Sequence, residues 1–315
     1  MSAPKFLVLL STYNGEKFIE EQLDSVLKQQ EIELHILIRD DGSTDNTVSL
    51  IKRYMNSYTG NISLLEAENI GAKGSFFELI ELAFKDLPTY DFFAFCDQDD
   101  IWNSQKLNRA ADILKKEPSY LPLMYCSATQ MVASDLTELS IWPAPPKKKL
   151  SFYNALVENV AVGCTTVLNQ NAFKLIASSL PKNINHVIMH DWWAYLCISS
   201  FGKVVFDDQP FILYRQHANN VLGGQTDNLI KKWKKRFQRY FKGQNHYIIS
   251  NQAEEFFKCF NNQLDEKKQQ DLKKFILSTK KASLPRLIYV LQSPFYRQSV
   301  SDWIILKIVF LIGNI

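Results

Sequence analysis

Short apolar runs alternate with amphipathic stretches through the first half of the chain. The apolar runs, which suit strands buried on both faces, cover residues 6–10, 34–38, 62–65, 92–96 and 123–127. Residues 16–29, 45–56, 75–84 and 104–116 instead carry apolar side chains at helical spacing. This alternation predicts βαβ units and an α/β fold with a mainly parallel central sheet.

The pattern is less regular beyond residue 142, where a Pro- and Lys-rich stretch to residue 150 predicts an exposed excursion. Further strands are expected at residues 161–168, 204–206 and 211–214, and a helix around 191–199. After Gly223-Gly224 the chain becomes helical in pattern, basic and aromatic. We therefore expect an α/β domain over residues 1–225 and a helical C-terminal region over residues 226–315.

Charge is distributed unevenly between these two regions. Residues 1–227 contain 19 Lys and Arg against 27 Asp and Glu, whereas residues 228–315 contain 17 against 6. A basic end suits a polyanionic surface, and nucleic acid is disfavoured because no recognised binding motif accompanies the charge. The apolar segment 303–313 is too short to cross a bilayer, which needs about 20 helical residues. Peripheral membrane contact and a packed bundle or homodimer interface both stay open.

The cysteines and the N-terminus bear on the compartment. Five cysteines are scattered singly among apolar residues and lack CxxC spacing, as expected for buried thiols in a reducing cytosol. The first apolar run is short and lacks the basic start of a signal peptide. We expect a cytoplasmic protein, at most peripheral at the inner face of the cell membrane.

Polar loops follow three of the predicted strands, and parallel strands place such loops at one sheet edge, where ligands bind. The first loop reads STYNGE and brings Ser11 and Tyr13 to that edge, although, taken alone, a turn bent by Asn14-Gly15 explains it better. The second reads DDGSTD, in which a turn leaves the adjacent Asp40 and Asp41 without a purpose. The carboxylate of Asp41 can accept the N3–H of a pyrimidine base.

The third loop, DQDDIW, crowds three carboxylates, Asp97, Asp99 and Asp100, at the end of an apolar strand. Such crowding is costly unless a cation or solvent compensates it. A hard divalent ion bound by carboxylates and phosphate oxygens would do so. Taken alone, an Asp-rich loop is more often solvated surface.

Together with NIGAKGSF at residues 69–76, the three loops resemble the family 2 glycosyltransferases, and the resemblance spans residues 5–225. DQDD followed by Ile-Trp is similar to the bacterial rhamnosyltransferase branch. The resemblance implies a GT-A fold and an inverting, metal-dependent enzyme. It would move a sugar from a nucleoside diphosphate donor, dTDP-L-rhamnose or a UDP-sugar, to a hydroxyl of a cell-surface polysaccharide or lipid-linked glycan.

The resemblance also implies roles for individual residues. Tyr13 and Asp41 would contact the base, Asp97 the ribose side, and Asp99 the Mg²⁺ or Mn²⁺ ion that bridges the diphosphate. Lys73 lies in the segment where a basic residue near the nucleotide is useful, and Ser11 is within the first nucleotide loop.

The second half should then provide the acceptor side. Asp191 matches the family's general base, and the following Trp192 and Trp193 can stack on acceptor sugars, although they can equally pack as core. In the segment YRQH, His217 would complete the metal site or hydrogen-bond the diphosphate, and Arg215 would offset the diphosphate charge. We also expect residues 217–225 to close over the donor.

Two other functions agree with the same features. A metal-dependent nucleotidyltransferase also places carboxylates at a parallel sheet's edge, and a non-catalytic glycan- or membrane-binding module would retain the nucleotide fold.

Overall fold

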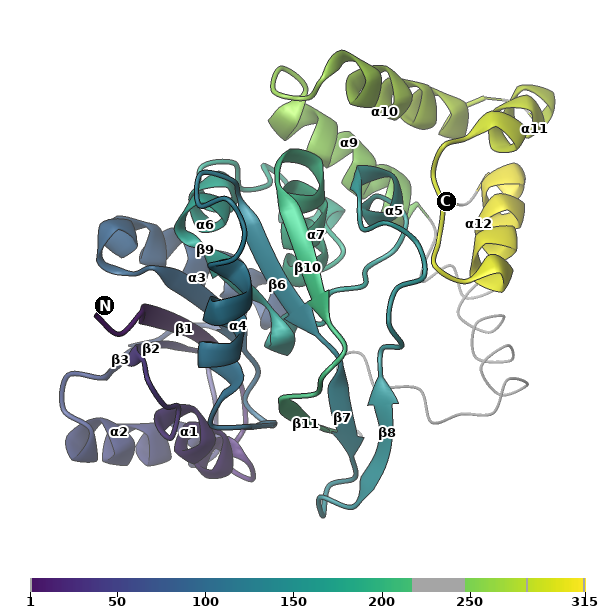
Figure 1. Ribbon diagram of the computed structural model, residues 1–315. Coiled ribbons are helices and arrows are strands. Elements are labelled where there is room, and N and C mark those ends of the chain that lie inside the picture. The colour runs from purple at the N-terminus through teal and green to yellow at the C-terminus, as the bar shows by residue number, and fades with distance from the viewer. Residues whose placement is uncertain (1, 217–246, 282, 314) are drawn as a thin grey trace. The chain divides into compact units, whose positions relative to one another are not determined.

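The computed structural model describes residues 2–216, 247–281, 283–313 and 315 (Figure 1). Contacts divide the chain into two compact units. The first comprises residues 1–145, 161–178 and 201–224, and the second comprises residues 146–160, 179–200 and 225–315. The units therefore do not follow a single cut near residue 225, because two earlier segments belong to the second unit.

A seven-stranded sheet forms the centre of the first unit, in the order β10-β6-β9-β4-β1-β2-β3. Its strands are β1 (Lys5–Thr12), β2 (Glu33–Asp40), β3 (Ile62–Glu66), β4 (Phe92–Cys96), β6 (Leu123–Ser127), β9 (Val167–Asn169) and β10 (Lys203–Asp207). Neighbouring strands are parallel except at β9, which is antiparallel to both β4 and β6. The predicted α/β fold with a mainly parallel sheet is confirmed.

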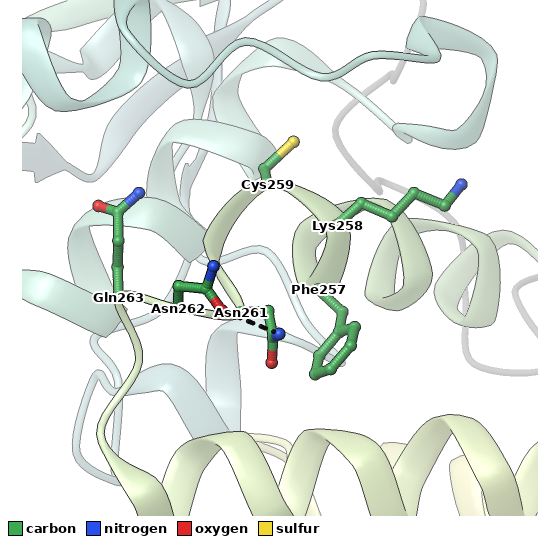
Figure 2. A pocket seen from close by; sticks show the side chains of 6 residues that line it. All are labelled: Phe257, Lys258, Cys259, Asn261, Asn262 and Gln263. Atoms are coloured by element: carbon green, nitrogen blue, oxygen red, sulfur yellow. Dashed lines mark hydrogen bonds between the residues drawn. The ribbon is translucent and has the colours of Figure 1, made fainter.

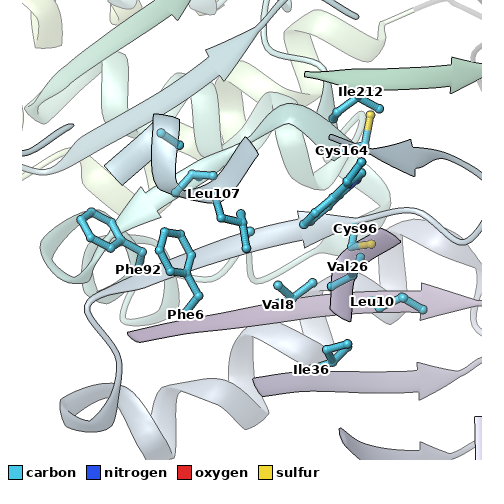
Figure 3. Close-up of a cluster of buried hydrophobic side chains, with 14 of the residues drawn as sticks. Phe6, Val8, Leu10, Val26, Ile36, Phe92, Cys96, Leu107, Cys164 and Ile212 are labelled. Carbon is cyan, nitrogen blue, oxygen red and sulfur yellow. The ribbon is translucent and has the colours of Figure 1, made fainter. Parts of the chain in front are cut away.

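The helices of the first unit bury their apolar sides against this sheet. They are α1 (Ile19–Leu27), α2 (Thr47–Ser57), α3 (Gly71–Ala83), α4 (Lys106–Leu114) and α6 (Gln170–Ala177). β1 is buried along almost its whole length, and Phe6 stacks on Phe92 with ring centroids 5.0 Å apart. Figure 3 shows this cluster, in which side chains of β1, β2 and β4 meet those of α1 and α4. Burial of these runs fixes the strand register, and so the level at which each loop leaves the sheet.

A smaller four-stranded sheet, in the order β5-β11-β7-β8, extends the first unit. It contains β5 (Ile101–Trp102), β7 (Thr129–Val132), β8 (Glu138–Trp142) and β11 (Ile212–Arg215). The sequence indicated only β11, because the other three are short or exposed. The strand predicted over residues 161–168 is wrong in extent. Residues 163–165 form a 3₁₀ turn, in which the Thr165 hydroxyl donates to the Val162 carbonyl at 2.7 Å.

The second unit is helical, as predicted for the C-terminal region. Its helices are α5 (Phe152–Ala155), most of α7 (His190–Phe201), α9 (Ile248–Phe260), α10 (Glu266–Thr279), α11 (Ser283–Gln292) and α12 (Val300–Ile312). Phe152 contacts both Phe256 and Phe295, with centroids 6.1 and 5.8 Å away. The backbone N–H of Tyr296 donates to the Tyr153 carbonyl at 3.2 Å. These contacts attach residues 146–160 to the C-terminal helices.

Two further predictions concern cysteines and membrane segments. All five cysteines are free thiols, four of them buried and Cys259 half-buried. None of the helices within the described ranges is both long and apolar enough to cross a bilayer. The first part of the predicted helical C-terminal region, up to residue 246, lies outside the described residues.

Candidate active site

The loops that follow β4, β1 and β2 lie side by side, because these strands are neighbours in the sheet. The Asp41 amide donates to the Thr12 carbonyl at 2.8 Å and so joins the second loop to the first. Gln98 joins the third loop to the first: its Oε1 accepts from the Thr12 hydroxyl at 2.6 Å and from the Tyr13 amide at 2.8 Å. The sequence did not indicate Gln98, since its partner lies 85 residues away.

Tyr13, Ser11 and Lys73 lie around the first of these loops. The side chain of Tyr13 is 46% exposed and free to meet a planar ligand. The hydroxyl of Ser11 instead donates to that of Ser75 on α3 at 2.6 Å. Lys73, in the first turn of α3, is half-buried, and this burial lowers its pKa.

The adjacent carboxylates Asp40 and Asp41 have structural partners, which corrects the expectation that a turn leaves them without a purpose. Asp40 accepts from the amide and hydroxyl of Ser43 at 2.8 and 2.5 Å. Asp41 accepts from the Ile70 and Gly71 amides at 2.9 and 2.8 Å, at the start of α3. Asp41 therefore ties its loop to α3, whose N-terminal end favours negative charge.

A buried arginine holds Asp41 from the other side. Arg39 is 1% exposed, and its guanidinium donates to Asp41, to Glu78 and to the Glu68 carbonyl. Asp41, itself 2% exposed, thus has three internal donors. Because its Oδ2 receives only one of these hydrogen bonds, a ligand donor can still be accepted there.

The acidic loop after β4 contains a strongly perturbed carboxylate. Asp100 is completely buried, and burial, followed by the charges of Asp99 and Asp97, raises its pKa well above the usual value. Its Oδ1 accepts from the Arg215 amide at 3.1 Å, while its Oδ2 has no hydrogen-bond partner among the described residues. A cation bound here would compensate this crowding.

The side chains in this loop fit a hard divalent cation. Ligand atoms of Asp97, Asp100 and Cys164 all lie within 4.8 Å of one another. Two carboxylates suit Mg²⁺ or Mn²⁺, whereas burial raises the pKa of the Cys164 thiol, which therefore stays protonated. Asp99, the ligand that the resemblance implied, is outside this group. Sequence reasoning did not assign Asp100 or Cys164 to it.

Arg215 is buried beneath the acidic loop. Its Nε donates to the Asp99 carbonyl at 2.9 Å, its Nη1 to the Ser134 carbonyl at 2.8 Å, and its Nη2 pairs with Glu21. Its guanidinium also lies 4.4 Å from the ring centroid of Phe18. These contacts make Arg215 a support for the loop, and its predicted contact with the diphosphate stays a prediction.

A second buried cation, Lys106, lies near the same loop. Lys106 is 1% exposed, and its Nζ lies 3.3 Å from the centroid of the Trp102 ring. Burial lowers its pKa to about 8, against the opposing effect of Cys96, Cys164 and Asp100. Lys106 thus supplies positive potential beneath the carboxylates, a role that its helical spacing in the sequence could not reveal.

Asp191 and its neighbours belong to the second unit. Asp191 lies in the first turn of α7, is 8% exposed, and accepts from the Trp192 amide at 2.6 Å. The indole N–H of Trp192, which is partly exposed, donates to the Ala155 carbonyl at 2.6 Å. The role of Asp191 as general base stays a prediction.

Trp193 is not available to stack on a sugar, which corrects one acceptor assignment. It is completely buried in the second unit and lies edge-on to Phe256 with centroids 5.8 Å apart. Consecutive helical residues point about 100° apart, so Trp193 faces inward while Trp192 does not. His217 and the proposed closing segment 217–225 lie outside the described residues.

A surface hollow of about 310 Å³ lies elsewhere, at the end of α9 and the turn that follows (Figure 2). It is lined by Phe257, Lys258, Cys259, Asn261, Asn262 and Gln263. None of the predicted site residues lines it, so it is no candidate for the donor site.

Comparison with known proteins decides the family. A family model described as glycosyl transferase family 2 matches residues 7–176, more than half of the chain. The chain belongs to this family. The family 2 resemblance and the GT-A fold are thereby confirmed, and glycosyl transfer from a nucleotide-sugar donor takes precedence over nucleotidyl transfer and over a non-catalytic role.

Relatives within family 2 refine the comparison. The dTDP-rhamnosyl transferase RfbG of Shigella flexneri is 32% identical over 230 residues, which cover 68% of this chain and 73% of that protein. The Escherichia coli UDP-Glc:alpha-D-GlcNAc-diphosphoundecaprenol beta-1,3-glucosyltransferase WfgD is 27% identical over 229 residues, 72% of this chain and 83% of that protein. This family 2 chain is therefore of the rhamnosyltransferase-like type.

Solved structures agree on the fold of this family 2 chain. Staphylococcus aureus TarS 1-349 in complex with UDP-GlcNAc aligns with a TM-score of 0.56 at 15% identity, covering 98% of this chain and 92% of that one. GalNAc-T7 with UDP, GalNAc and Mn²⁺ aligns with a TM-score of 0.53 at 9% identity, covering 88% and 50%.

The ion pair of Arg39 with Asp41 yields a prediction about stability. Removing one partner of a buried pair leaves an uncompensated charge, so Arg39→Met should lower the free energy of unfolding by about 3–5 kcal/mol. Arg53→Met is the matched control, because Arg53 is 61% exposed and pairs with Glu20 at the surface. It should cost at most about 1 kcal/mol. Urea unfolding measures both, and equal losses would refute the assigned importance of the buried pair.

The burial of His190, next to Asp191, leads us to expect that the free energy of unfolding depends on pH. Burial lowers its pKa to about 3, below the roughly 6.5 of the unfolded chain, so the unfolded state binds a proton first as pH falls. Stability is thus lost from about pH 6.5 downward, by about 2 kcal/mol between pH 7 and pH 5. His190→Leu should lack this component. Urea unfolding of both proteins at the two pH values measures the difference, and identical pH dependence would contradict the assignment.

Proposed function

We propose that this chain is an inverting, metal-dependent glycosyltransferase whose donor is dTDP-L-rhamnose. Its acceptor is a hydroxyl of a cell-surface polysaccharide or of a lipid-linked glycan precursor. One observation supports the metal and donor site above all. The carboxylates of Asp97 and Asp100 lie at the same edge of the sheet as the loops that contain Tyr13 and Asp41. The rhamnose assignment is supported by RfbG, and the lipid-linked acceptor by the name of WfgD.

The nucleotide would bind to the loops after β1 and β2. Tyr13, with its exposed ring, stacks on the base, and the Oδ2 of Asp41 accepts the base N3–H. Asp41 is already fixed by Arg39 and two amides, so little entropy is lost when the base binds. Ser11 lies at the end of β1 and Lys73 in the first turn of α3. In this proposal both face the ribose and phosphates.

The diphosphate would bind beside the acidic loop. Asp97 and Asp100, with Asp99 from the same loop and His217 after β11, would hold Mg²⁺ or Mn²⁺. When bound, the ion neutralises charge on the departing diphosphate and so favours its release. Arg215 holds the loop in place through the Asp99 carbonyl, and Lys106 adds positive potential from below.

Asp191 is the proposed general base. Its carboxylate takes the proton of the acceptor hydroxyl while that oxygen attacks the anomeric carbon from the face opposite the diphosphate, which inverts the configuration. The Trp192 ring, held through its indole N–H, orients the acceptor sugar.

Donor identity is tested by thermal stabilisation of the whole chain. With Mg²⁺ or Mn²⁺ present, dTDP-L-rhamnose at about 100 times its Kd should stabilise the native state by about 2.7 kcal/mol, and a chelator should abolish the shift. UDP-glucose and UDP-GlcNAc are the comparison donors. Stabilisation by a UDP-sugar alone would overturn the rhamnose assignment, and the absence of any metal-dependent shift would overturn the metal site.

Two substitutions separate donor binding from proton transfer. Asp99→Ala should weaken metal-dependent donor binding, whereas Asp191→Asn should keep donor affinity and lower turnover by about 10²- to 10⁴-fold. Asp100→Ala, measured in parallel, tells which carboxylate dominates the metal site. Asp135→Asn is the control, because Asp135 is exposed and outside the acidic loop. Unchanged turnover in Asp191→Asn would remove Asp191 from its role.

A further inference from the structure

The C-terminal region contains the helices α11 and α12 (Figure 1). Each carries a stripe of exposed aliphatic side chains. The stripes are Leu284, Leu287, Ile288 and Leu291 on α11, and Val300, Ile304, Ile308 and Ile312 on α12. Their spacing of three or four residues places each set on one side of its helix. Eight of the 19 exposed large hydrophobic residues of the described chain lie in these two helices, so they form a concentrated surface rather than normal scatter.

The opposite sides of the same helices are packed within the second unit. Val290 on α11 and Leu306 and Phe310 on α12 are buried. Tyr289 stacks on Phe310 with centroids 5.3 Å apart, and Phe310 also meets Phe275 of α10. The inner sides therefore anchor α11 and α12, and the aliphatic stripes are not needed for that packing.

Positive charge accompanies the stripes. Residues 280–315 contain five Lys and Arg but one acidic residue, Asp302; Lys280 is ion-paired with Glu254 at 2.8 Å, so the other four basic residues carry the excess. Lys307 lies between the exposed Ile304 and Ile308 in sequence, and its Nζ is 3.7 Å from the ring centroid of Trp303. A tryptophan and a lysine beside aliphatic side chains are typical of helices that lie in the headgroup region of a bilayer.

We propose that the aliphatic stripes of α11 and α12 dock into the interface of an anionic phospholipid bilayer. The charge decides between this occupant and a second copy of the chain. Two copies joined through these stripes would bring two positively charged regions together, whereas an anionic leaflet compensates the charge, each Lys or Arg adding to binding. Since neither helix is long enough to span a bilayer, contact would be in the plane of the membrane surface.

This inference does not rest on the proposed donor or on Asp191. It would place the enzyme at the surface where a lipid-linked acceptor resides, so it bears on how such an acceptor is reached.

Vesicle flotation of the full chain tests the proposal. The chain should float with vesicles of phosphatidylglycerol and phosphatidylethanolamine, and much less with pure phosphatidylcholine. The double variants Leu284→Gln/Leu291→Gln and Ile304→Gln/Ile308→Gln should each lower the partition coefficient at least about tenfold. Because all four side chains are exposed, the variants should keep the wild-type melting temperature.

Lys281→Gln/Lys307→Gln should lower binding to the anionic vesicles by about tenfold or more, and added salt should act in the same direction.

A matched control uses exposed aliphatic residues outside the two helices. Leu139→Gln/Ile141→Gln on β8 changes side chains that are 44% and 55% exposed and should leave flotation unchanged. Absence of flotation by the wild-type chain, or equal losses in the control and the stripe variants, would overturn the proposal. So would a dimer that the stripe variants dissociate without any change in lipid binding, measured by light scattering. Donor-induced thermal stabilisation of the stripe variants should equal that of the wild type, so failure here is distinct from failure of the proposed reaction.

Discussion

The crowding of negative charge at the end of β4 is the constraint on which the site depends. Asp100 is completely buried with two further carboxylates nearby, and burial and these charges raise its pKa, so its ionised form is costly unless positive charge compensates it. The fold supplies part of this compensation: the Arg215 amide donates to Asp100, the Arg215 guanidinium holds the Asp99 carbonyl, and Lys106, buried on the Trp102 ring, interacts with the charge of Asp100. These contacts hold the loop in place, and the proposed divalent cation would supply the remaining positive charge.

The sheet order converts this local constraint into a binding site. Because β4 pairs with β1 and β1 pairs with β2, all in parallel, three loops from distant parts of the sequence leave the sheet together. Short polar contacts then hold them together: Gln98 joins the third loop to the first, and Asp41 fastens the second loop to α3. The proposed donor site is therefore pre-formed in its backbone, a state that reduces the entropy lost on binding.

Sequence patterns predicted the parts of this arrangement that depend on local apolar runs. β1, β2 and β4 and the polar loops after them were expected because each run is continuous and buried. The short extent and antiparallel direction of β9 and the two-residue β5 were not expected, since distant strand partners rather than local composition define them. The same limit applies to side chains. The strand pattern around Arg39 and the helical pattern around Lys106 do not reveal which groups these buried cations contact. Trp192 and Trp193 are adjacent in sequence, and only the packing of α7 shows that Trp193 alone is completely buried.

The interleaved chain of the second unit has a consequence for how the protein can be divided. Phe152 and Trp193 are synthesised before the aromatic residues that pack on them. Phe295 packs on Phe152 and Phe256 on Trp193, and both come from the last quarter of the chain. A polypeptide cut at residue 225 would leave these two large side chains without their partners and prone to aggregate. The transferase is thus not a detachable module with an optional tail, and the final helices complete the fold of segments translated long before them.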